Sequence, residues 1–400
     1  MQPDKPSRLA QLQAVVRLAG LDGWLLYDFR GQNPFAARML QLDPALLTRR
    51  WFLYLPAHGR PTLIHHRIEA NTWGQILPDD NLLRLDFASY QQLDGQLRQA
   101  LQGARRVAME YSPGGENPYV GTVDAGTLER VRACGVELVS SADLLQQFET
   151  WDAADIAAHE QAVAGVIAAK DAAFGWIDAR LKAGQPVSEL AVQALLVEQI
   201  EACGLVFDHP PIVAFGSHAS DGHYAPGPQS DRLLEMGQCV LIDLWAGQDD
   251  RPMADITWVG FAGEPTAEYL RIWQAVSAGR DLALELLTTR AVEFGWQVDR
   301  AVRDLITSHG YGEFFRHRLG HSLGRNRAHG QSVHLDDWET HDTRRLLPGL
   351  GVTVEPGVYL GHVGIRSEVN VLMTESGACV TTPIQQEPYR LGIKGESIQK

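Results

Sequence analysis

The sequence predicts an α+β protein of two domains, and three observations indicate this class. Residues 1–150 alternate short apolar segments with helical patterns, which is typical of an α/β layer. The remainder opens with a long alanine-rich helical stretch and continues with β-branched runs, so helices are expected outside a sheet. The length of 400 residues suits two domains that each bury a sizeable core. We place the boundary near residue 150, which gives domains 1–150 and 151–400.

The N-terminal portion contains the short elements expected of an α/β layer. Amphipathic helices are predicted around Leu9 to Leu18 and near Gln91 to Leu101. Apolar and β-branched runs predict strands at 24–27, 51–55, 62–65 and 107–110. The alternation of strands with helices favours a largely parallel or mixed sheet.

Four helices are predicted in the larger C-terminal portion. The alanine-rich stretch that opens within 148–161 continues towards Ala179 as one long helix. Ser188 is a suitable N-cap for a second helix that reaches about Cys203, because its hydroxyl can accept a backbone N–H of the first turn. Two further helices are expected at 266–287 and 298–308, packed outside the sheet.

Composition disfavours several partners and compartments. The chain has 35 lysines and arginines against 49 aspartates and glutamates, and its formal net charge of −14 disfavours nucleic acid or an anionic membrane as the main partner. The four cysteines have no CxxC spacing, so neither a disulfide framework nor a zinc finger is expected. The N-terminal residues lack the apolar core of an export signal, and no apolar run is long enough to span a bilayer. A reducing cytoplasm is the expected compartment.

Two aspartates lie in strand-like segments, where an unpaired acid would be costly. Asp243 ends the apolar run CVLID, and Asp255 lies within the run 253–261. The separation between them allows a strand, a turn at Gly247 to Asp250 and a return strand. We therefore expect the two carboxylates to face each other across a hairpin.

A histidine and two glutamates have similar contexts further along the chain. His321 is set among glycines in LGHSLG, which let the backbone approach a ligand closely. Glu355 and Glu368 each lie inside a strand-like run. Any one acid alone is better explained by an arginine partner or a turn. In combination, two aspartates, one histidine and two glutamates form an oxygen-rich set that favours two hard or borderline divalent ions.

The segments that carry these residues are VLIDLW, ADITWVG, GHSLG, TVEPGVY and GIRSEVNV, with PPIVAFGSHASDGHY upstream. They resemble segments of the pita-bread metallopeptidases, which include Xaa-Pro dipeptidase (prolidase), Xaa-Pro aminopeptidase, methionine aminopeptidase and creatinase. The resemblance is strong over 155–385 and loose in the N-terminal portion. Two details depart from it: the family often has a glycine and aromatic pair between the two aspartates, and often an acid or asparagine after the last ligand. In this chain the segment from the first aspartate to the second is DLWAGQDDRPMAD, and Val369 follows Glu368.

The resemblance implies a fold and a cofactor. The expected fold is a C-terminal pita-bread (creatinase/aminopeptidase) domain with a smaller, creatinase-like α/β domain before it, and the expected assembly is a homodimer. The expected cofactor is two divalent ions per subunit, with manganese, cobalt and zinc as candidates. The implied metal ligands are Asp243, Asp255, His321, Glu355 and Glu368.

The resemblance also implies a reaction, the hydrolysis of Xaa-Pro dipeptides by a metal-bridging hydroxide. Glu355 would be a ligand that also passes the proton of the attacking water to the leaving nitrogen. His223 and His329 match active-site histidines of the family and would bind the carbonyl oxygen of the substrate. His334 is a nearby competitor for the role given to His329.

Two arginines are candidates for binding the substrate. Arg366 precedes Glu368 by two residues, so it would share a strand face with that ligand and orient an acid there. Arg344, beside Arg345 in HDTRRLLPG, would supply a cation for the substrate carboxylate. Two alternatives stay open, an Xaa-Pro aminopeptidase that acts on longer peptides and a non-catalytic pita-bread module that binds peptides or proteins. The complete ligand set favours an enzyme, and the compact chain favours the dipeptidase.

Overall fold

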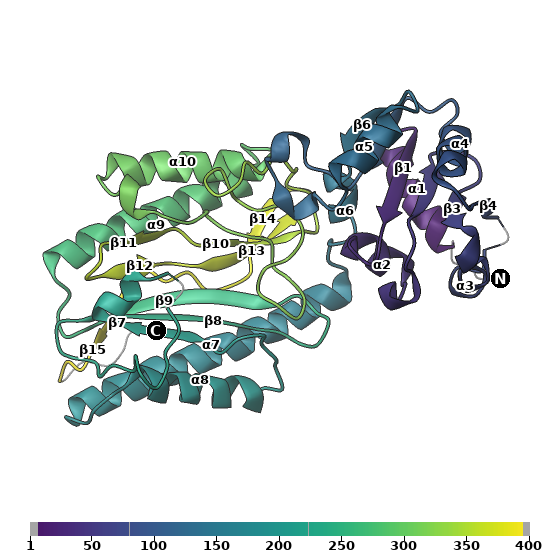
Figure 1. The fold of residues 1–400 in the computed structure, drawn as a ribbon. Helices are drawn as coiled ribbons and strands as arrows, with labels where there is room; N and C mark the ends of the chain where they lie inside the picture. The colour runs from purple at the N-terminus through teal and green to yellow at the C-terminus, as the bar shows by residue number, and fades with distance from the viewer. Residues whose placement is uncertain (1–6, 80, 223, 395–400) are drawn as a thin grey trace. The chain divides into compact units, whose positions relative to one another are not determined.

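The computed structural model describes residues 7–79, 81–222 and 224–394. The chain divides into two compact units, Met1–Phe148 and Glu149–Lys400 (Figure 1). Within the described ranges, no helix is long and apolar enough to cross a membrane. All four cysteines are free thiols.

A mixed six-stranded sheet forms the centre of the first unit. Its strand order is β4-β3-β2-β1-β5-β6. Strands β1 and β2 pair antiparallel, as do β2 and β3, whereas β3 with β4, β1 with β5 and β5 with β6 are parallel. The predicted mixed sheet and its four predicted strands are confirmed, and β4 and β6 were not predicted. The bounds are β1 Gly23–Asp28, β2 Trp51–Pro56, β3 Thr62–His66, β4 Leu83–Phe87, β5 Arg106–Met109 and β6 Glu137–Ser140.

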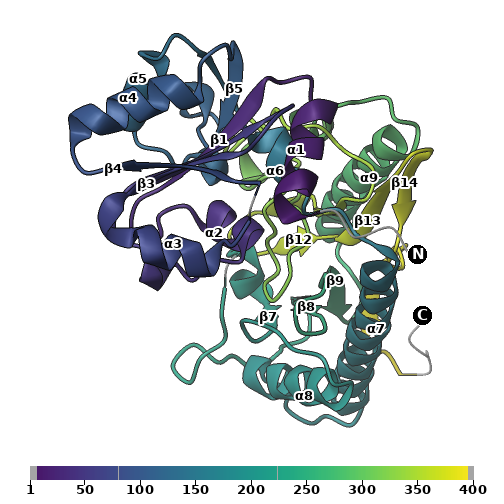
Figure 2. The same ribbon diagram turned by 90° about the vertical axis from the view of Figure 1, so that its right-hand side faces the viewer.

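Helices cover both faces of this sheet, because successive side chains of β1 point to opposite sides. Trp24 and Leu26 pack on the face covered by α1, α2, α3 and α6, whereas Leu25 and Tyr27 pack on the face covered by α4 and α5 (Figure 2). The two predicted helices correspond to α1 and α4. The bounds are α1 Arg8–Leu18, α2 Pro34–Leu40, α3 Ala70–Ile76, α4 Tyr90–Ala100, α5 Ala125–Arg132 and α6 Ala142–Gln146.

One buried carboxylate, that of Glu110, joins several elements of the first unit. Its Oε1 accepts hydrogen bonds from Trp24 Nε1 at 2.5 Å and Ser141 Oγ at 3.0 Å, and its Oε2 accepts one from Asn33 Nδ2 at 2.8 Å. Burial raises the pKa of Glu110 to about 7, against the lowering effect of these three donors. The folded state therefore binds this proton more tightly than the unfolded state does.

We expect the free energy of unfolding to fall as the pH rises through the interval between the ordinary glutamate pKa and about 7. A group whose folded-state pKa is raised contributes stability below its unfolded pKa and loses it as the pH rises through the folded value. The loss is of the order of 3 kcal/mol. Urea unfolding of the full chain at pH 5 and pH 8 measures it. Glu110→Gln should flatten this dependence, and Glu137→Gln, an exposed acid on β6, should leave it unchanged.

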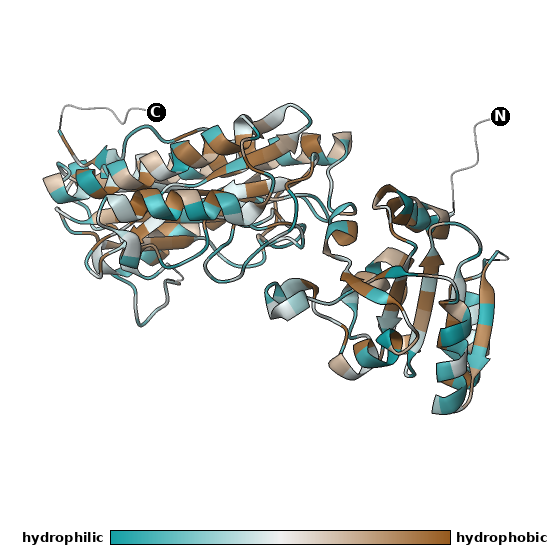
Figure 3. Ribbon diagram, turned by 90° about the horizontal axis from the view of Figure 1, so that it is seen from above, coloured by the Kyte–Doolittle hydropathy of each residue, from teal (hydrophilic) through white to brown (hydrophobic). Residues whose placement is uncertain are grey.

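The second unit has helices on both sides of its strands (Figure 1). Helices α7 and α8 pack together and cover the four-stranded sheet of order β15-β9-β8-β7. Helices α9 and α10 cover the sheets β10-β13-β14 and β11-β12. In Figure 3 the helices alternate between hydrophilic and hydrophobic segments, as amphipathic covering helices do.

The four predicted helices of this unit are present, and their caps explain where they begin. Helix α7 starts after Asp152, which forms a reciprocal capping box with Asp155. Ser188 caps α8 as predicted, by accepting a hydrogen bond from Ala191 N, and Thr266 caps α9 in the same way. The helix bounds are α7 Ala153–Lys182, α8 Glu189–Ala202, α9 Ala267–Thr288 and α10 Gly295–Ser308. The strand bounds are β7 Ile212–Phe215, β8 Cys239–Ala246, β9 Ala254–Ala262, β10 Gly351–Val354, β11 Gly357–Tyr359, β12 Gly364–Arg366, β13 Val369–Thr374, β14 Gly377–Val380 and β15 Tyr389–Leu391.

Candidate metal centre

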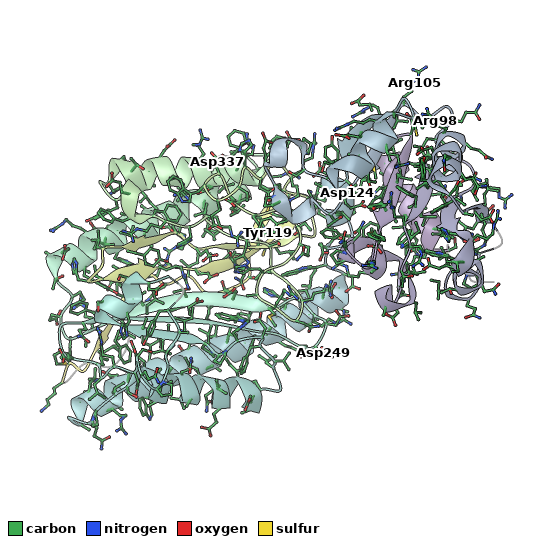
Figure 4. All side chains as sticks on the ribbon, in the orientation of Figure 1. Arg98, Arg105, Tyr119, Asp124, Asp249 and Asp337 are labelled. Atoms are coloured by element: carbon green, nitrogen blue, oxygen red, sulfur yellow. The ribbon has the colours of Figure 1, made fainter. Side chains whose placement is uncertain are left out.

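The two aspartates lie on one face of the β8–β9 hairpin. Asp243 pairs with Thr257 and Trp245 pairs with Asp255, so the predicted hairpin is confirmed. The two carboxylates are diagonal neighbours and do not face each other directly, because their pairing partners differ by two positions. Both side chains are buried. Figure 4 labels Asp249, an exposed residue of the turn that joins the two strands.

The two glutamates lie at breaks in strands, and the expectation that they lie inside strands is wrong. Val354 pairs with Val369, and Gly357 pairs with Arg366, so the ladder of this antiparallel pair is interrupted between these positions. Pro356 has no N–H to continue the ladder. The backbone N–H groups instead bond elsewhere: Glu355 N donates to Leu319 O at 2.8 Å, and Glu368 N donates to Thr257 O at 3.2 Å. The break brings both carboxylates to the β8–β9 hairpin.

His321 lies on a segment that runs beside β10. Its backbone N donates to Thr353 Oγ1 at 2.9 Å, and Thr353 N donates to His321 O at 2.8 Å. Its Nδ1 lies 2.9 Å from Ser322 O, and because a carbonyl only accepts, Nδ1 carries the proton. Burial lowers the pKa of His321, so the imidazole is favoured in its neutral form. Its Nε2 lone pair is then available to a metal ion.

The five residues form one buried cluster. His321 Nε2 lies 3.5 Å from Asp255 Oδ2 and 3.4 Å from Glu355 Oε1. Ligand atoms of Asp255, His321 and Glu368 all lie within 4.8 Å of one another. Thr257 Oγ1 connects the fifth residue, Asp243, to the others, because it lies 3.2 Å from Asp243 Oδ1 and 2.7 Å from Glu368 Oε2. The structure therefore brings all five predicted ligands together.

The charges of this cluster favour cation binding. Burial, reinforced by repulsion from neighbouring carboxylates, raises the pKa of Asp255 and of Glu368 well above the ordinary value, and burial also raises the pKa of Glu355. A bound cation relieves both the desolvation and the repulsion. The buried groups are four carboxylates, one neutral imidazole and the guanidinium of Arg366, so their net charge is negative and suits two divalent ions. The residues that would hold the ions are Asp243, Asp255, His321, Glu355 and Glu368.

Arg366 lies among these carboxylates. Its Nη2 forms an ion pair with Asp243 Oδ2, its Nε donates to Thr257 Oγ1 at 2.8 Å, and its Nε lies 3.9 Å from Glu355 Oε2. Attraction to Asp243 keeps the pKa of Arg366 well above the ordinary value despite burial. The guanidinium thus orients an acid of the cluster. Its binding of substrate stays a prediction.

His329 lies at the exposed side of the cluster. Its ring lies 4.0 Å from the ring of His321, centroid to centroid, and its Nδ1 lies 3.2 Å from Arg318 Nη2. The competitor His334 is buried, and its Nδ1 accepts a hydrogen bond from Ser322 N at 3.0 Å. His334 therefore supports the backbone beside His321, the predicted metal ligand. His223 lies outside the described residues.

Arg344 is buried in an ion pair. Its Nε and Nη2 bond to Asp342, with Nη2 to Oδ2 at 2.6 Å, and its Nη1 donates to Gln331 O at 2.7 Å. Its neighbour Arg345 is exposed and pairs with Glu293 at 2.6 Å. The binding of a substrate carboxylate by Arg344 stays a prediction, and these contacts give its guanidinium a structural role.

Four residues of the site were missed in the sequence. Thr257 lies two positions from Asp255 in β9, and Thr353 in β10 lies two positions before Glu355, so a period of two was the signal that could have found them. Tyr359 OH lies 3.5 Å from Arg366 Nη1 and 2.8 Å from His317 Nε2. Arg318 had no signal of its own, because its contact with His329 depends on how the intervening segment folds back.

An ion cluster around the buried Asp155 anchors the segment that carries the histidines. Asp155, at the start of α7, accepts from Arg325 Nη1 at 2.8 Å and Nη2 at 2.7 Å, and from Arg251 Nη1 at 2.8 Å. Arg325 follows His321 closely in the chain, and Arg251 lies in the β8–β9 turn. Hydrogen bonds from Arg325 hold the pKa of Asp155 well below its usual range.

We expect Asp155→Asn to lower the free energy of unfolding by about 3 kcal/mol, because two arginines lose their counter-ion. This value is at the low end for a buried pair, since both arginines keep some contact with solvent. The stabilisation is present above the ordinary aspartate pKa and is lost as the pH falls. Urea unfolding at pH 7 measures the effect. Asp304→Asn, an exposed acid on α10, is the control, and equal stability of the two variants would contradict the prediction.

Comparison with known proteins decides the family. The model of metallopeptidase family M24 matches residues 157–375, more than half of the chain. The chain belongs to this family. The second unit is its pita-bread domain, and the first is the α/β domain before it, so the predicted fold class and the predicted family are confirmed.

Uncharacterized peptidases of staphylococci are among the sequence relatives of this M24 chain. An uncharacterized peptidase of Staphylococcus saprophyticus is 35% identical over 198 residues, which are 48% of this chain and 52% of that protein. One of Staphylococcus epidermidis is 32% identical over 179 residues, 44% of this chain and 47% of that protein. The chain spans about half the length of the curated relatives it matches.

Solved structures resemble the chain over most of its length. The dipeptidase PepE of Mycobacterium ulcerans has a TM-score of 0.64 and 26% identity, and the match covers 95% of this chain and 96% of that one. A prolidase of Pyrococcus horikoshii has a TM-score of 0.56 and 22% identity, with 96% and 99% covered. The latter likeness shows the fold alone.

Proposed function

We propose that this M24 peptidase is an Xaa-Pro dipeptidase that uses two divalent metal ions, with manganese, cobalt and zinc as candidates, and works as a cytoplasmic homodimer. The observation that carries the proposal is the buried cluster of Asp243, Asp255, His321, Glu355 and Glu368 in a chain of a metallopeptidase family. The likeness to a solved dipeptidase over 95% of the chain supports the choice of substrate length.

The chemistry of the cluster suits peptide hydrolysis. Two divalent ions, when bound, would lower the pKa of water enough to supply hydroxide near neutral pH and would polarise the scissile carbonyl. Glu355 would accept the proton of the attacking water and pass it to the leaving nitrogen. Thr353 Oγ1 donates a hydrogen bond to Glu355 Oε1 at 3.2 Å and so orients this carboxylate within the strand break.

The exposed histidine would act on the carbonyl oxygen. The ring of His329 lies against the ring of His321, so a donor on the His329 ring would lie close to a peptide bound at the cluster. His223 keeps the same proposed role. Proline in the second position suits a dedicated enzyme, because its nitrogen has no N–H for an ordinary peptidase to bind and its ring fixes the backbone.

Substrate length tests this proposal. We expect Ala-Pro to be cut at least about tenfold faster, in kcat/KM, than Ala-Pro-Gly, because a site that binds a free carboxylate after proline excludes a further residue. The comparison uses the metal-loaded chain with Ala-Pro, Ala-Pro-Gly and a longer peptide that begins Xaa-Pro. Equal rates would replace the dipeptidase by an Xaa-Pro aminopeptidase. Binding of all three peptides without cleavage would indicate a non-catalytic module.

A further inference from the structure

We propose that Arg318 is a positioning residue that holds His329 in the tautomer with its proton on Nε2, and that Glu339 holds Arg318. The inference rests on the proposed function only for its kinetic consequence. The tautomer itself follows from contacts in the structure.

The contact between Arg318 and His329 decides which ring nitrogen carries the proton. Arg318 Nη2 lies 3.2 Å from His329 Nδ1. A guanidinium has donors and no acceptor, so Nδ1 must accept with its lone pair. The proton of the neutral ring then lies on Nε2. His329 therefore has a donor on the edge opposite to Arg318.

Glu339 fixes the position of Arg318 in two ways. Its Oε1 accepts a hydrogen bond from the Arg318 backbone N at 3.0 Å, and its Oε2 lies 3.8 Å from Arg318 Nη1. The turn that carries Glu339 is itself capped by the buried Asp336, whose carboxylate accepts from the backbone N–H groups of Trp338, Glu339 and Thr340. The side chain of Arg318 is only 9% exposed, so it is held within the protein.

The orientation of His329 is fixed relative to the metal ligands. Its ring packs against the ring of His321 at a centroid distance of 4.0 Å and an angle of 38°. Its backbone is bridged to Leu323, two residues beyond His321. With the ring held on both sides, the Nε2–H group can serve as the donor to a developing oxyanion. The opposite tautomer would present a lone pair there, which repels negative charge.

Nitrogen-15 NMR of the metal-free full chain, labelled at histidine, reads the tautomer without any assay of activity. We expect His329 to show an unprotonated Nδ1 and a protonated Nε2, with its signals assigned by their loss in His329→Gln. In Arg318→Met we expect these signals to shift towards a mixture of tautomers. Arg316→Met, an exposed arginine two residues away, is the matched control and should leave them unchanged. An Nδ1–H tautomer in the unsubstituted chain would overturn the proposal.

Kinetics with a dipeptide substrate tests the consequence. We expect Arg318→Met to lower kcat by about 10- to 100-fold with KM changed less than about twofold, as is typical when a supporting hydrogen bond of an active-site histidine is lost. Arg318→Lys, which keeps a cationic donor, should restore part of kcat. In the His329→Ala background the Arg318 substitution should cost nothing further, because its effect passes through His329.

Each outcome decides between this proposal and a different role. A rise in KM with unchanged kcat, or an Arg318→Met effect that persists in His329→Ala, would assign Arg318 to direct substrate binding and overturn the positioning role. If Arg318→Met does not fold, Glu339→Gln weakens the same support at a partly exposed site, and it should shift the His329 signals in the same direction. If no Xaa-Pro peptide is cut, the proposed function fails, and the NMR result still decides the tautomer.

Discussion

Glu355→Gln is expected to lower kcat by about 10³-fold while the chain stays folded and binds its ions. An amide occupies the space of the carboxylate but cannot accept the proton of the attacking water, and a positioned general base contributes on this scale. The neighbouring hydroxyl of Thr353 can still donate to the amide oxygen, so the local geometry is retained. Steady-state kinetics with Ala-Pro gives kcat and KM separately.

The interpretation of Glu355→Gln depends on its ion content. Metal analysis of the variant should show the same number of ions per chain as the unsubstituted protein, since the group of Asp255, His321 and Glu368, whose ligand atoms lie within 4.8 Å of one another, is unchanged. Glu375→Gln, an exposed acid in the turn between β13 and β14, is the control for replacing a carboxylate by an amide. Turnover within about threefold of the unsubstituted chain, at equal ion content, would remove Glu355 from the proton-transfer role.

Removal of metal is expected to abolish activity, and reconstitution with manganese, cobalt or zinc should restore it with two ions per chain. Asp255→Asn should reduce the ion content, because Asp255 lies 3.5 Å from His321 Nε2 and belongs to the group of ligand atoms within 4.8 Å of one another. Asp249→Asn, in the exposed turn of the same hairpin, is the matched control. A dinuclear centre would be contradicted if the unsubstituted chain bound at most one ion and Asp255→Asn bound as much as Asp249→Asn.

The same experiment has a definite pH dependence. Burial and mutual repulsion raise the pKa values of Asp255 and Glu368, and a carboxylate must lose its proton to bind a metal ion. Protons therefore compete with the ions, and affinity should increase as the pH rises through these raised values. In the metal-free chain the sign is opposite for stability, because a raised folded-state pKa gives stability that is lost as the pH rises. Titration calorimetry and urea unfolding at pH 6 and pH 8 measure the two effects.

Local patterns predicted most of the secondary structure, because caps and periodicities act over a few residues. Ser188 and Thr266 each cap a helix by accepting a backbone N–H of its first turn, which depends only on neighbouring residues. Strands β4 and β6 were missed because their burial is partial, and a strand of five or four residues with mixed exposure has no clear period of two. The strand breaks at Glu355 and Glu368 were also missed, since an interruption of a ladder depends on what the partner strand does.

The sequence by itself was sufficient to propose the metal ligands of this protein. The five proposed metal ligands lie in short segments whose chemistry is evident from residue type and from the family motifs that surround them. The carboxylates had to be paired, protonated or metal-bound once their segments were buried.

Only the tertiary structure decided which partner each arginine near the site binds. Arg344, Arg366 and Arg318 have the same charge in the sequence, but Arg344 is bound by Asp342, Arg366 by Asp243, and Arg318 lies beside His329. A long, flexible arginine reaches partners far from it along the chain, so its role depends on which segments pack around it. Residue type specified the chemistry of the site, and packing assigned each charge to its partner.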